Sequence, residues 1–381
     1  MDKWRKIKEE KEYRFLSRFA SKSVDSRGRV IDEEPCPIRT VFERDGNRII
    51  HSSEFRRLRH KTQVFFNTQN DHICTRMEHV LNVSSIANII ARTLDLNQDL
   101  TYAIAMGHDL GHAPFGHTGE RVINKCVQSI NSKIAFHHEN HSLRVVDRLA
   151  TRISEQDQQH GLNLSYEVRD GIVSHCGEIF GEYKLKRDIL KNADDIYITN
   201  NREHMPYTLE GCVVRLTDKI AYVGRDLEDA IRAGIIELNV FSKYVTEELG
   251  RTNSQIINTL VMDIIENSYD KDSIELSEEK GQALKELLTI NNEYIYNSHK
   301  IKVYEKNTMN ILESIFFAIY EIAKNAESVD KSNMSVVKNF KKFVLQMGYD
   351  DKETPEQKTI DFVAGMTDNY AVKCYEELFW I

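Results

Sequence analysis

Residues 107–120 contain most of the side chains in this sequence that could do chemistry. Within fourteen residues they bring together three histidines, His108, His112 and His117, with Asp109 and Glu120, separated by glycines and one proline. A segment with so many imidazoles and carboxylates is too polar for a protein core. It either lies on the surface without a role or collects these groups around a charged ligand, and we favour a metal ion that carries a phosphate.

Two residues distant in the sequence can complete such a site. His79 and Asp218 each fall in a segment with helical periodicity, so three helices can bring them to His108 and Asp109. Taken alone, His79 is more typical of a structural histidine. Two neutral imidazoles and two carboxylates suit Mn, Fe, Co, Ni or Zn, and suit Mg alone less well. A divalent ion held in this way would keep positions open for water and substrate, lower the pKa of that water and polarise a phosphoryl oxygen.

The segment 213–234 adds a polar helix face. Asp218, Tyr222 and Asp226 recur every four residues, which places a carboxylate, a phenol and a second carboxylate in a row. The opposite face is apolar, and we expect it to be buried. It contains Val213, Leu216, Ile220, Val223, Leu227 and Ile231. An acidic helix face is usually solvated, but the tyrosine at its centre favours a binding site.

Basic residues gather between Ile38 and Gln63 in an otherwise acidic chain. This stretch has seven Arg or Lys residues against three acidic ones. Two interpretations remain open. The residues form a solvated helix face, or they are directed at phosphates, for which the forked guanidinium of arginine is well suited.

Apolar residues at three- and four-residue spacing, together with only five prolines, predict a mostly α-helical chain. We expect helices over residues 73–94, 98–108, 136–149, 162–176, 213–234 and 311–323, and a loop over 191–208. The second of these helices ends where His108 and Asp109 meet Gly111, so this pair can face a cleft. On the fourth, His175 is expected to be a capping or core histidine. The first 35 residues are charged and are expected to pack loosely.

The composition is that of a soluble globular protein, with 41% hydrophobic and 29% charged residues. A formal charge of −8 argues against a protein that coats nucleic acid or anionic membranes through global basicity. The six cysteines stand alone, which fits a reducing compartment and six small buried thiols. We see no apolar signal segment and no run near the ~20 residues of a membrane helix, so we expect a cytoplasmic protein without a membrane partner.

The chain resembles the HD superfamily of phosphohydrolases, whose signature is a helical His, a His-Asp pair and a distant helical Asp. Longer strings narrow the resemblance to the deoxynucleoside triphosphate triphosphohydrolases, the dGTPase-like dNTPases. These strings include Arg48-Ile49-Ile50-His51-Ser52, Phe55-Arg56-Arg57-Leu58, Lys61-Thr62-Gln63-Val64-Phe65, Gly107 to Glu120, His138-Glu139-Asn140 and Asp218-Lys219-Ile220-Ala221-Tyr222. The similarity covers residues 38–232 in order and is less clear in the C-terminal third.

The resemblance implies an all-α HD-domain core with additional C-terminal helices. It also implies hydrolysis of a dNTP, with a dGTP-like substrate favoured, at the α-phosphorus to the deoxynucleoside and inorganic tripolyphosphate. The implied metal ligands are His79, His108, Asp109 and Asp218. The implied catalytic residues are His117, Glu120 and His138. In this assignment Glu120 orients His117, His117 protonates the departing 5′ oxygen, and His138 supports the pair.

Further residues match positions that contact the nucleotide in the family. They are Gln63, Arg76, His112, Lys219, Tyr222, Asp226 and Tyr296. His112 and Lys219 resemble α-phosphate contacts, and Arg76 resembles a phosphate or stacking arginine. Gln63, Tyr222 and Asp226 match sugar contacts, whereas Tyr296 is expected to press against C2′ and exclude a ribose.

We expect three regions: a charged N-terminal segment (1–37), an HD-type catalytic core (38–234) and a C-terminal helical region (235–381) packed on the core. The family also implies a homo-oligomer, with a nucleotide or single-stranded nucleic acid as a regulator. One alternative is another HD phosphohydrolase, which would not need His117, Glu120 and His138 together with Lys219 and Tyr222. The other is a non-catalytic nucleotide sensor or single-strand nucleic-acid binder that uses residues 38–66.

Overall fold

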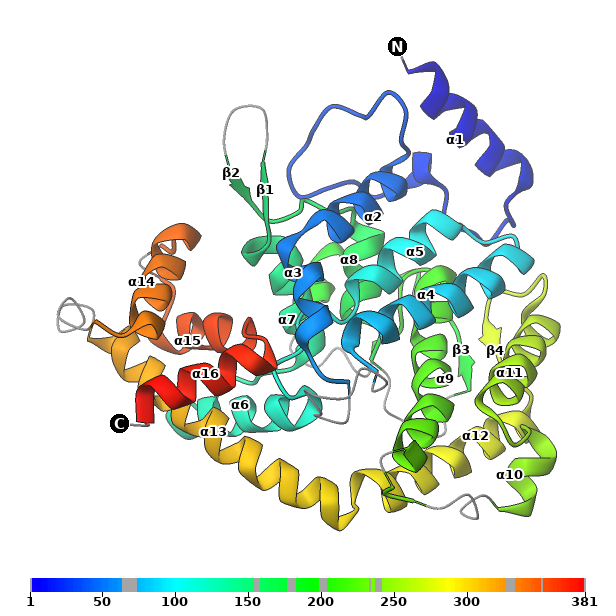
Figure 1. Cartoon of the computed structure of the whole chain (residues 1–381). Coiled ribbons are helices and arrows are strands. Elements are labelled where there is room, and N and C mark those ends of the chain that lie inside the picture. The colour runs from blue at the N-terminus through cyan, green and yellow to red at the C-terminus, as the bar shows by residue number, and fades with distance from the viewer. Residues whose placement is uncertain are drawn as a thin grey trace.

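The computed structural model describes residues 2–63, 74–153, 158–176, 183–198, 204–232, 234–236, 242–325, 333–350 and 352–379. Most of its regular structure is helical, and the prediction of an all-α fold is confirmed (Figure 1). The strands in this part of the chain form two short antiparallel pairs. These are β1 (Thr151–Ile153) with β2 (Gln158–His160), and β3 (Lys184–Leu185) with β4 (Ile274–Glu275).

The helices up to residue 232 are α1 (Lys3–Phe15), α2 (Val41–His51), α3 (Ser53–Arg57), α4 (Arg76–Thr93), α5 (Gln98–Gly107), α6 (Gly116–Ile130), α7 (His138–Arg144), α8 (Tyr166–Val173) and α9 (Leu209–Arg232). Short 3₁₀ turns occupy Ser23–Asp25, Leu58–His60 and Ala193–Tyr197, and a π-helical turn at Val145–Leu149 extends α7. The later helices are α10 (Lys243–Glu248), α11 (Asn253–Ser268), α12 (Glu278–Ile290), α13 (His299–Lys324), α14 (Ser335–Met347), α15 (Pro355–Ala364) and α16 (Asp368–Phe379). A second π-helical turn, Asn291–Tyr296, follows α12.

Helix α5 lies at the centre of the largest hydrophobic cluster among the described residues, where it contacts α2, α4, α8 and α9. Ile104 of α5, Ile172 of α8 and Val213 of α9 are fully buried in this cluster. Burial of one such side chain contributes about 1.5–3 kcal/mol. Because α5 is enclosed on several sides, its C-terminal end holds His108 and Asp109 in a fixed position.

Helix α6 belongs to a second hydrophobic cluster, which it shares with α13, α14, α15 and α16 (Figure 1). Ile123 of α6 and Phe316 of α13 are both fully buried there. Residues 107–120 therefore cross from one cluster to the other, since α5 ends at Gly107 and α6 begins at Gly116. The polar residues between these helices lie at the junction of the two clusters.

The turn between α5 and α6 lies directly against α7, and Gly111 is its point of closest approach. A Cβ atom at this position would lie 2.1 Å from the backbone nitrogen of Ser142 and 2.4 Å from the carbonyl oxygen of His138. The Gly111 N–H donates to Ser142 Oγ at 2.8 Å, and the Ser142 hydroxyl donates to the His108 carbonyl at 2.7 Å. These contacts fix the distance between His108 and the helix that begins at His138.

Gly111→Ala is therefore expected to destabilise the protein by at least about 1–3 kcal/mol, since the added methyl group must displace backbone atoms. Urea unfolding followed by circular dichroism measures the change. Gly365→Ala is the control, because a Cβ atom there would come no closer than 3.0 Å to its nearest neighbour, the Asp361 carbonyl oxygen. Equal unfolding midpoints for the two variants would contradict the close approach at Gly111.

Several helix boundaries differ from the predicted ones. Helix α4 begins at Arg76 because Thr75 and Glu78 form a capping box, in which the Glu78 carboxylate accepts from the Thr75 N–H at 2.7 Å. The predicted helix 98–108 is observed as α5, and 213–234 is observed as α9 with an earlier start at Leu209. The prediction of a helix over 162–176 was too long, since α8 covers Tyr166–Val173. The loop expected over 191–208 contains a 3₁₀ turn, and its residues 199–203 lie outside the described ranges.

The expectation that the first 35 residues pack loosely was wrong for the part after α1. Helix α1 itself has no buried residue. The Ser21 N–H, however, donates to Glu210 of α9 at 3.0 Å, and the Ser23 N–H donates to Glu12 at 2.6 Å. The buried Glu210 carboxylate therefore holds this charged segment on the core, and the bond to Glu12 joins the segment to α1.

Candidate active site

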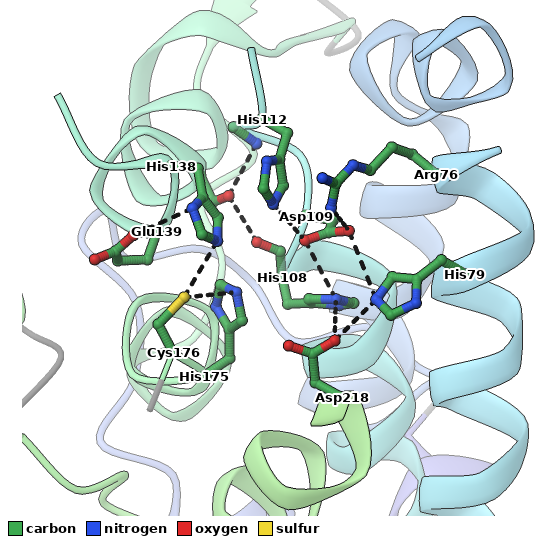
Figure 2. A network of polar contacts seen from close by, with 12 residues as sticks. Arg76, His79, His108, Asp109, His112, His138, Glu139, His175, Cys176 and Asp218 are labelled. Carbon is green, nitrogen blue, oxygen red and sulfur yellow. Dashed lines mark hydrogen bonds and ion pairs between the residues drawn. The ribbon is translucent and has the colours of Figure 1, made fainter. Parts of the chain in front are cut away.

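Four predicted metal ligands converge from three helices (Figure 2). His79 comes from α4, His108 and Asp109 follow the end of α5, and Asp218 comes from α9. Asp218 Oδ1 lies 2.8 Å from His79 Nε2 and 3.9 Å from His108 Nε2. Asp109 Oδ1 lies 3.4 Å from His108 Nε2. The structure thus places two imidazoles and two carboxylates around one point.

The surroundings of His108 show that this donor set fits a cation. Its Nδ1–H donates to the Ala105 carbonyl at 2.7 Å, so Nε2 of the neutral ring carries a lone pair. Nε2 is buried, has no hydrogen-bond partner among the described residues, and faces carboxylate oxygens of Asp109 and Asp218. A lone pair opposite two carboxylates is unfavourable unless a cation lies between them. The hydrogen bond at Nδ1 is the outer support typical of a metal-binding histidine.

Neighbouring groups keep Asp109 ionised. Burial alone would raise its pKa, but the Arg76 guanidinium and the hydrogen bond from His112 hold the pKa of Asp109 well below its ordinary value. Arg76 Nη1 donates to Asp109 Oδ2 at 2.9 Å, and His112 Nε2 lies 3.0 Å from Oδ1. Burial and the nearby Arg76 charge lower the pKa of His112, so this imidazole is neutral. Arg76 therefore contacts a proposed metal ligand.

Glu120 joins three histidines on the other side of the site. Its Oε2 lies 2.8 Å from His138 Nδ1 and 3.7 Å from His117 Nδ1, and its Oε1 lies 3.9 Å from His137 Nδ1. Burial alone would raise the pKa of Glu120, but the His138 charge and the histidine hydrogen bonds hold it well below its ordinary value. Burial also opposes a charge on His138, but Cys176 and Glu120 outweigh it and raise the pKa of His138. An ionised carboxylate can only accept, so His138 Nδ1 donates to Glu120.

A cavity of about 500 Å³ unites these groups, a volume within the usual range of small-molecule sites. The predicted site residues in its wall are Gln63, Arg76, His79, Asp109, His112, His117, Glu120, His138, Asp218, Lys219, Tyr222, Asp226 and Tyr296. His108 lies behind this wall and is fully buried. The wall also contains residues that we did not single out, among them Arg215, Asn292, Tyr304 and Glu305. No local motif marks them, because only the packing of the C-terminal helices brings most of them here.

Two of the basic residues between 38 and 63, Arg48 and Lys61, hold chain segments together. Arg48 pairs with Glu33 at 2.8 Å and donates to the carbonyls of Leu162 and Asn163 at 3.1 and 2.8 Å. The buried Lys61 ammonium donates to the carbonyls of His112 and Ala364. Among the described residues of this stretch, Gln63 alone lines the cavity. The interpretation as cations directed at phosphates is therefore not supported.

Helix α9 extends the cavity away from the metal ligands. Asp218, Tyr222 and Asp226 all line it, and the distance from the first to the last corresponds to ~12 Å of helix. The Tyr296 hydroxyl donates to Asp226 Oδ2 at 2.5 Å. Gln63 Oε1 is buried and has no hydrogen-bond partner among the described residues, so it can accept a hydrogen bond from a ligand.

Asp226→Asn is expected to raise stability at neutral and alkaline pH. Burial raises the pKa of Asp226 from 3.8 to about 7, although the Tyr296 hydroxyl opposes the shift. The folded protein therefore binds more protons than the unfolded chain between these two pKa values, and its stability falls as the pH rises through this window. The variant lacks this titration. Its Tm should exceed that of the wild type above the folded-state pKa.

Calorimetric melting across this pH window tests the prediction. Glu228→Gln is the control, since Glu228 lies on the same helix and is partly exposed. If the Tm difference between Asp226→Asn and wild type is the same at both ends of the window, the assigned titration of Asp226 is incorrect.

Two family models match the chain, that of the HD domain over residues 76–223 and that of the phosphohydrolase-associated domain over residues 274–377. A deoxyguanosinetriphosphate triphosphohydrolase-like protein of Caldanaerobacter subterraneus subsp. tengcongensis is 40% identical over 377 residues, which are 99% of this chain and 96% of the relative. The chain belongs to this HD-domain family. Relatives of the same name from Desulfatibacillum aliphaticivorans and Clostridium tetani are each 36% identical and cover 98% and 94% of this chain, and 97% and 91% of their own lengths.

As a member of this family, the protein is a hydrolase of the HD type, a metal-dependent class. The HD match contains all four residues of the proposed donor set. The phosphohydrolase-associated match begins with β4 and continues into α16, where the sequence resemblance was least clear. In the part of the chain that the structure describes, none of the helices has the length and apolarity needed to cross a membrane.

Two residues near the end of α8 add to the site of this HD-domain protein. His175, expected to be a capping or core histidine, is buried but also lines the cavity. Cys176 Sγ lies 3.1 Å from His138 Nε2 and 3.3 Å from His175 Nε2. The expectation of six buried apolar thiols was wrong for Cys176, which has these polar contacts, and for Cys36, which is partly exposed. The adjacent histidine and cysteine were the only signal in the sequence.

Proposed function

We propose that the protein is a metal-dependent dNTP triphosphohydrolase. It would hydrolyse a deoxynucleoside triphosphate, with a dGTP-like substrate favoured, at the α-phosphorus and release the deoxynucleoside and inorganic tripolyphosphate. Membership of the family supports this class of reaction. The observation on which the proposal mainly rests is that one cavity joins the metal donor set, the Glu120 relay and the polar face of α9.

The proposed metal ligands are His79, His108, Asp109 and Asp218, for an ion of the group Mn, Mg, Fe, Co, Ni or Zn. Such an ion, when bound, polarises a phosphoryl oxygen and lowers the pKa of water. Lys219 follows Asp218 and lines the cavity, so we assign its ammonium to an α-phosphate oxygen.

The proposed proton transfer uses Glu120 and its histidines. We assign to His117 the donation of a proton to the departing 5′ oxygen, because its half-exposed side chain lines the cavity beside an ionised carboxylate. Glu120 orients the His117 imidazole, and His138 supports the pair through its 2.8 Å contact with Glu120. A general acid of this kind typically contributes about 10²–10⁴-fold to the rate.

The far end of the cavity would recognise the sugar. Gln63 Oε1 can accept a hydrogen bond from a 3′-hydroxyl, and Asp226 and Tyr222 lie along the same wall. The hydrogen bond to Asp226 fixes the Tyr296 ring. We propose that this ring contacts C2′ and leaves no room for a 2′-hydroxyl.

Product analysis tests the proposed reaction. The purified protein is incubated with each dNTP and NTP in the presence of Mn²⁺ or Mg²⁺, and the products are separated by ion-exchange chromatography. Deoxynucleoside and tripolyphosphate, absent from a matched Asp218→Ala preparation, are the expected result. Diphosphate or monophosphate products would instead indicate another HD phosphohydrolase. Absence of any product, including in nucleotide mixtures that supply an activator, would indicate a nucleotide sensor.

We further propose that the protein is a cytoplasmic homo-oligomer that a nucleotide or single-stranded nucleic acid regulates. The alternative of a non-catalytic single-strand binder is less well supported, because Arg48 and Lys61 of the basic stretch bind groups of the protein itself. Phe65 and Phe66, which would stack on bases in that reading, lie outside the described residues.

A further inference from the structure

We propose that His138, His175 and Cys176 form a second metal site, which selects a thiophilic divalent cation of the Zn²⁺ type. The three side chains are buried and line the cavity. Figure 2 shows the Cys176 sulfur in contact with both imidazoles, to the left of Asp218 and His79. The site is therefore distinct from the HD donor set.

The hydrogen bonds of the two imidazoles leave the correct atoms free to bind a metal. His138 Nδ1 donates to the ionised Glu120 carboxylate at 2.8 Å, and His175 Nδ1 donates to the Ile172 carbonyl at 2.6 Å. An ionised carboxylate and a backbone carbonyl have no proton to donate, so Nδ1 of each ring carries the shared proton. Nε2 of each ring is therefore the atom left for coordination. A carboxylate or backbone carbonyl at the other nitrogen is the usual outer support of a zinc-binding histidine.

The distances suit tetrahedral coordination. Cys176 Sγ lies 3.1 Å from His138 Nε2 and 3.3 Å from His175 Nε2. Zn–S and Zn–N bonds of the usual lengths subtend an S···N edge of ~3.6 Å in a tetrahedron. Each observed S···N distance is therefore within about half an ångström of the distance expected around a bound ion, and all three candidate ligand atoms lie within 4.8 Å of one another.

The type of ligand distinguishes this site from its neighbour. One thiolate and two imidazoles favour Zn²⁺, whereas the HD donor set has only nitrogen and oxygen ligands. Binding would release the thiol proton of Cys176, together with any proton on His138 Nε2. The ring of His175 also lies 4.9 Å from the ring of His108, so the two sites are adjacent.

Occupation of this site would inhibit the enzyme. The ion would occupy Nε2 of His138 while Nδ1 keeps its hydrogen bond to Glu120, so this imidazole could no longer take up or release a proton at Nε2. This consequence rests on the proposed function, but the metal site itself does not.

Cobalt binding to the full chain tests the site without any substrate. Mn²⁺ is supplied first to fill the HD donor set, and Co²⁺ is then titrated while the ultraviolet charge-transfer absorption of a cobalt–thiolate bond is recorded. We expect this absorption to saturate at one Co²⁺ per chain in the wild type and to be lost in Cys176→Ala. It should persist in Cys126→Ala, the control, because Cys126 is a buried thiol of the second hydrophobic cluster. Wild-type protein without the absorption, or absorption that survives in Cys176→Ala, would overturn the proposal.

Three further measurements separate the site from the HD donor set and from the reaction. Asp218→Ala should retain the cobalt–sulfur absorption, and its loss there would mean that the sulfur belongs to the HD metal site. In equilibrium dialysis with Zn²⁺, the affinity of this site should fall by about 100-fold or more in Cys176→Ala, beyond the effect of an outer-shell change. Zn²⁺ should inhibit dNTP turnover in the wild type and in Cys126→Ala but not in Cys176→Ala. If neither the wild type nor the two cysteine variants turn over a dNTP, the proposed function is wrong. The cobalt titration still shows whether the metal site exists.

Discussion

Asp218→Ala is expected to lose tightly bound metal and dNTP turnover together. Asp218 Oδ1 lies 2.8 Å from His79 Nε2 and 3.9 Å from His108 Nε2, so its carboxylate contributes negative charge at the point where the imidazoles meet. Loss of an outer-shell group typically lowers metal affinity or activity 10–100-fold. Loss of a direct ligand should exceed this, so we expect at least about a 100-fold decrease in Mn²⁺ affinity.

Equilibrium dialysis against Mn²⁺ and kcat/KM with dGTP measure these two effects. Glu228→Ala is the matched control, because Glu228 lies on the same helix and does not line the cavity. If Asp218→Ala keeps the wild-type affinity for Mn²⁺, Asp218 is not a ligand of the metal. Lost turnover with retained metal would instead assign Asp218 to the substrate.

His117→Ala is expected to lower kcat by about 10²–10⁴-fold, the usual contribution of a general acid, while metal affinity stays unchanged. His117 lines the cavity, and its Nδ1 lies 3.7 Å from Glu120 Oε2. It is absent from the His79, His108 and Asp109 donor group, so its removal leaves the metal ligands in place. Rapid-quench kinetics with dGTP and the same Mn²⁺ dialysis measure the two quantities.

His137→Ala is the natural control for this prediction. His137 also lines the cavity, and its Nδ1 lies 3.9 Å from Glu120 Oε1, but we assign it no role. Its loss should change kcat less than about tenfold, below the range for a general acid. Wild-type turnover in His117→Ala would refute the assigned proton role, and a large defect in His137→Ala alone would move that role to the neighbouring residue.

The C-terminal helices matter for the site as well as for stability. The Asp368 carboxylate of α16 accepts from the backbone N–H groups of Thr62 and Phe115, both at 2.9 Å. Phe115 has a positive φ of 63° immediately before α6, a conformation that a non-glycine residue adopts at a cost. The hydrogen bond from Asp368 thus helps to hold the turn that leads to His117. This explains why a region without a chemical motif belongs to the same functional unit.

The sequence alone was sufficient to predict the helical fold, the family and the converging residues His79, His108, Asp109 and Asp218. These inferences depend on helical periodicity and on a short signature of residue types, both of which are local properties of the chain. Helix ends were less accurate, because a capping box such as that of Thr75 and Glu78 decides where a helix begins.

Contacts between distant segments could be decided only by the tertiary structure. It showed that the imidazole nearest to Glu120 is His138 rather than His117, that Lys61 binds backbone carbonyls, and that Cys176 lies between two histidines. None of these contacts follows from spacing, because each depends on how helices far apart in the sequence pack against one another. Residue types determined which chemistry was available, and the packing of α5, α6, α7 and α9 determined which groups meet.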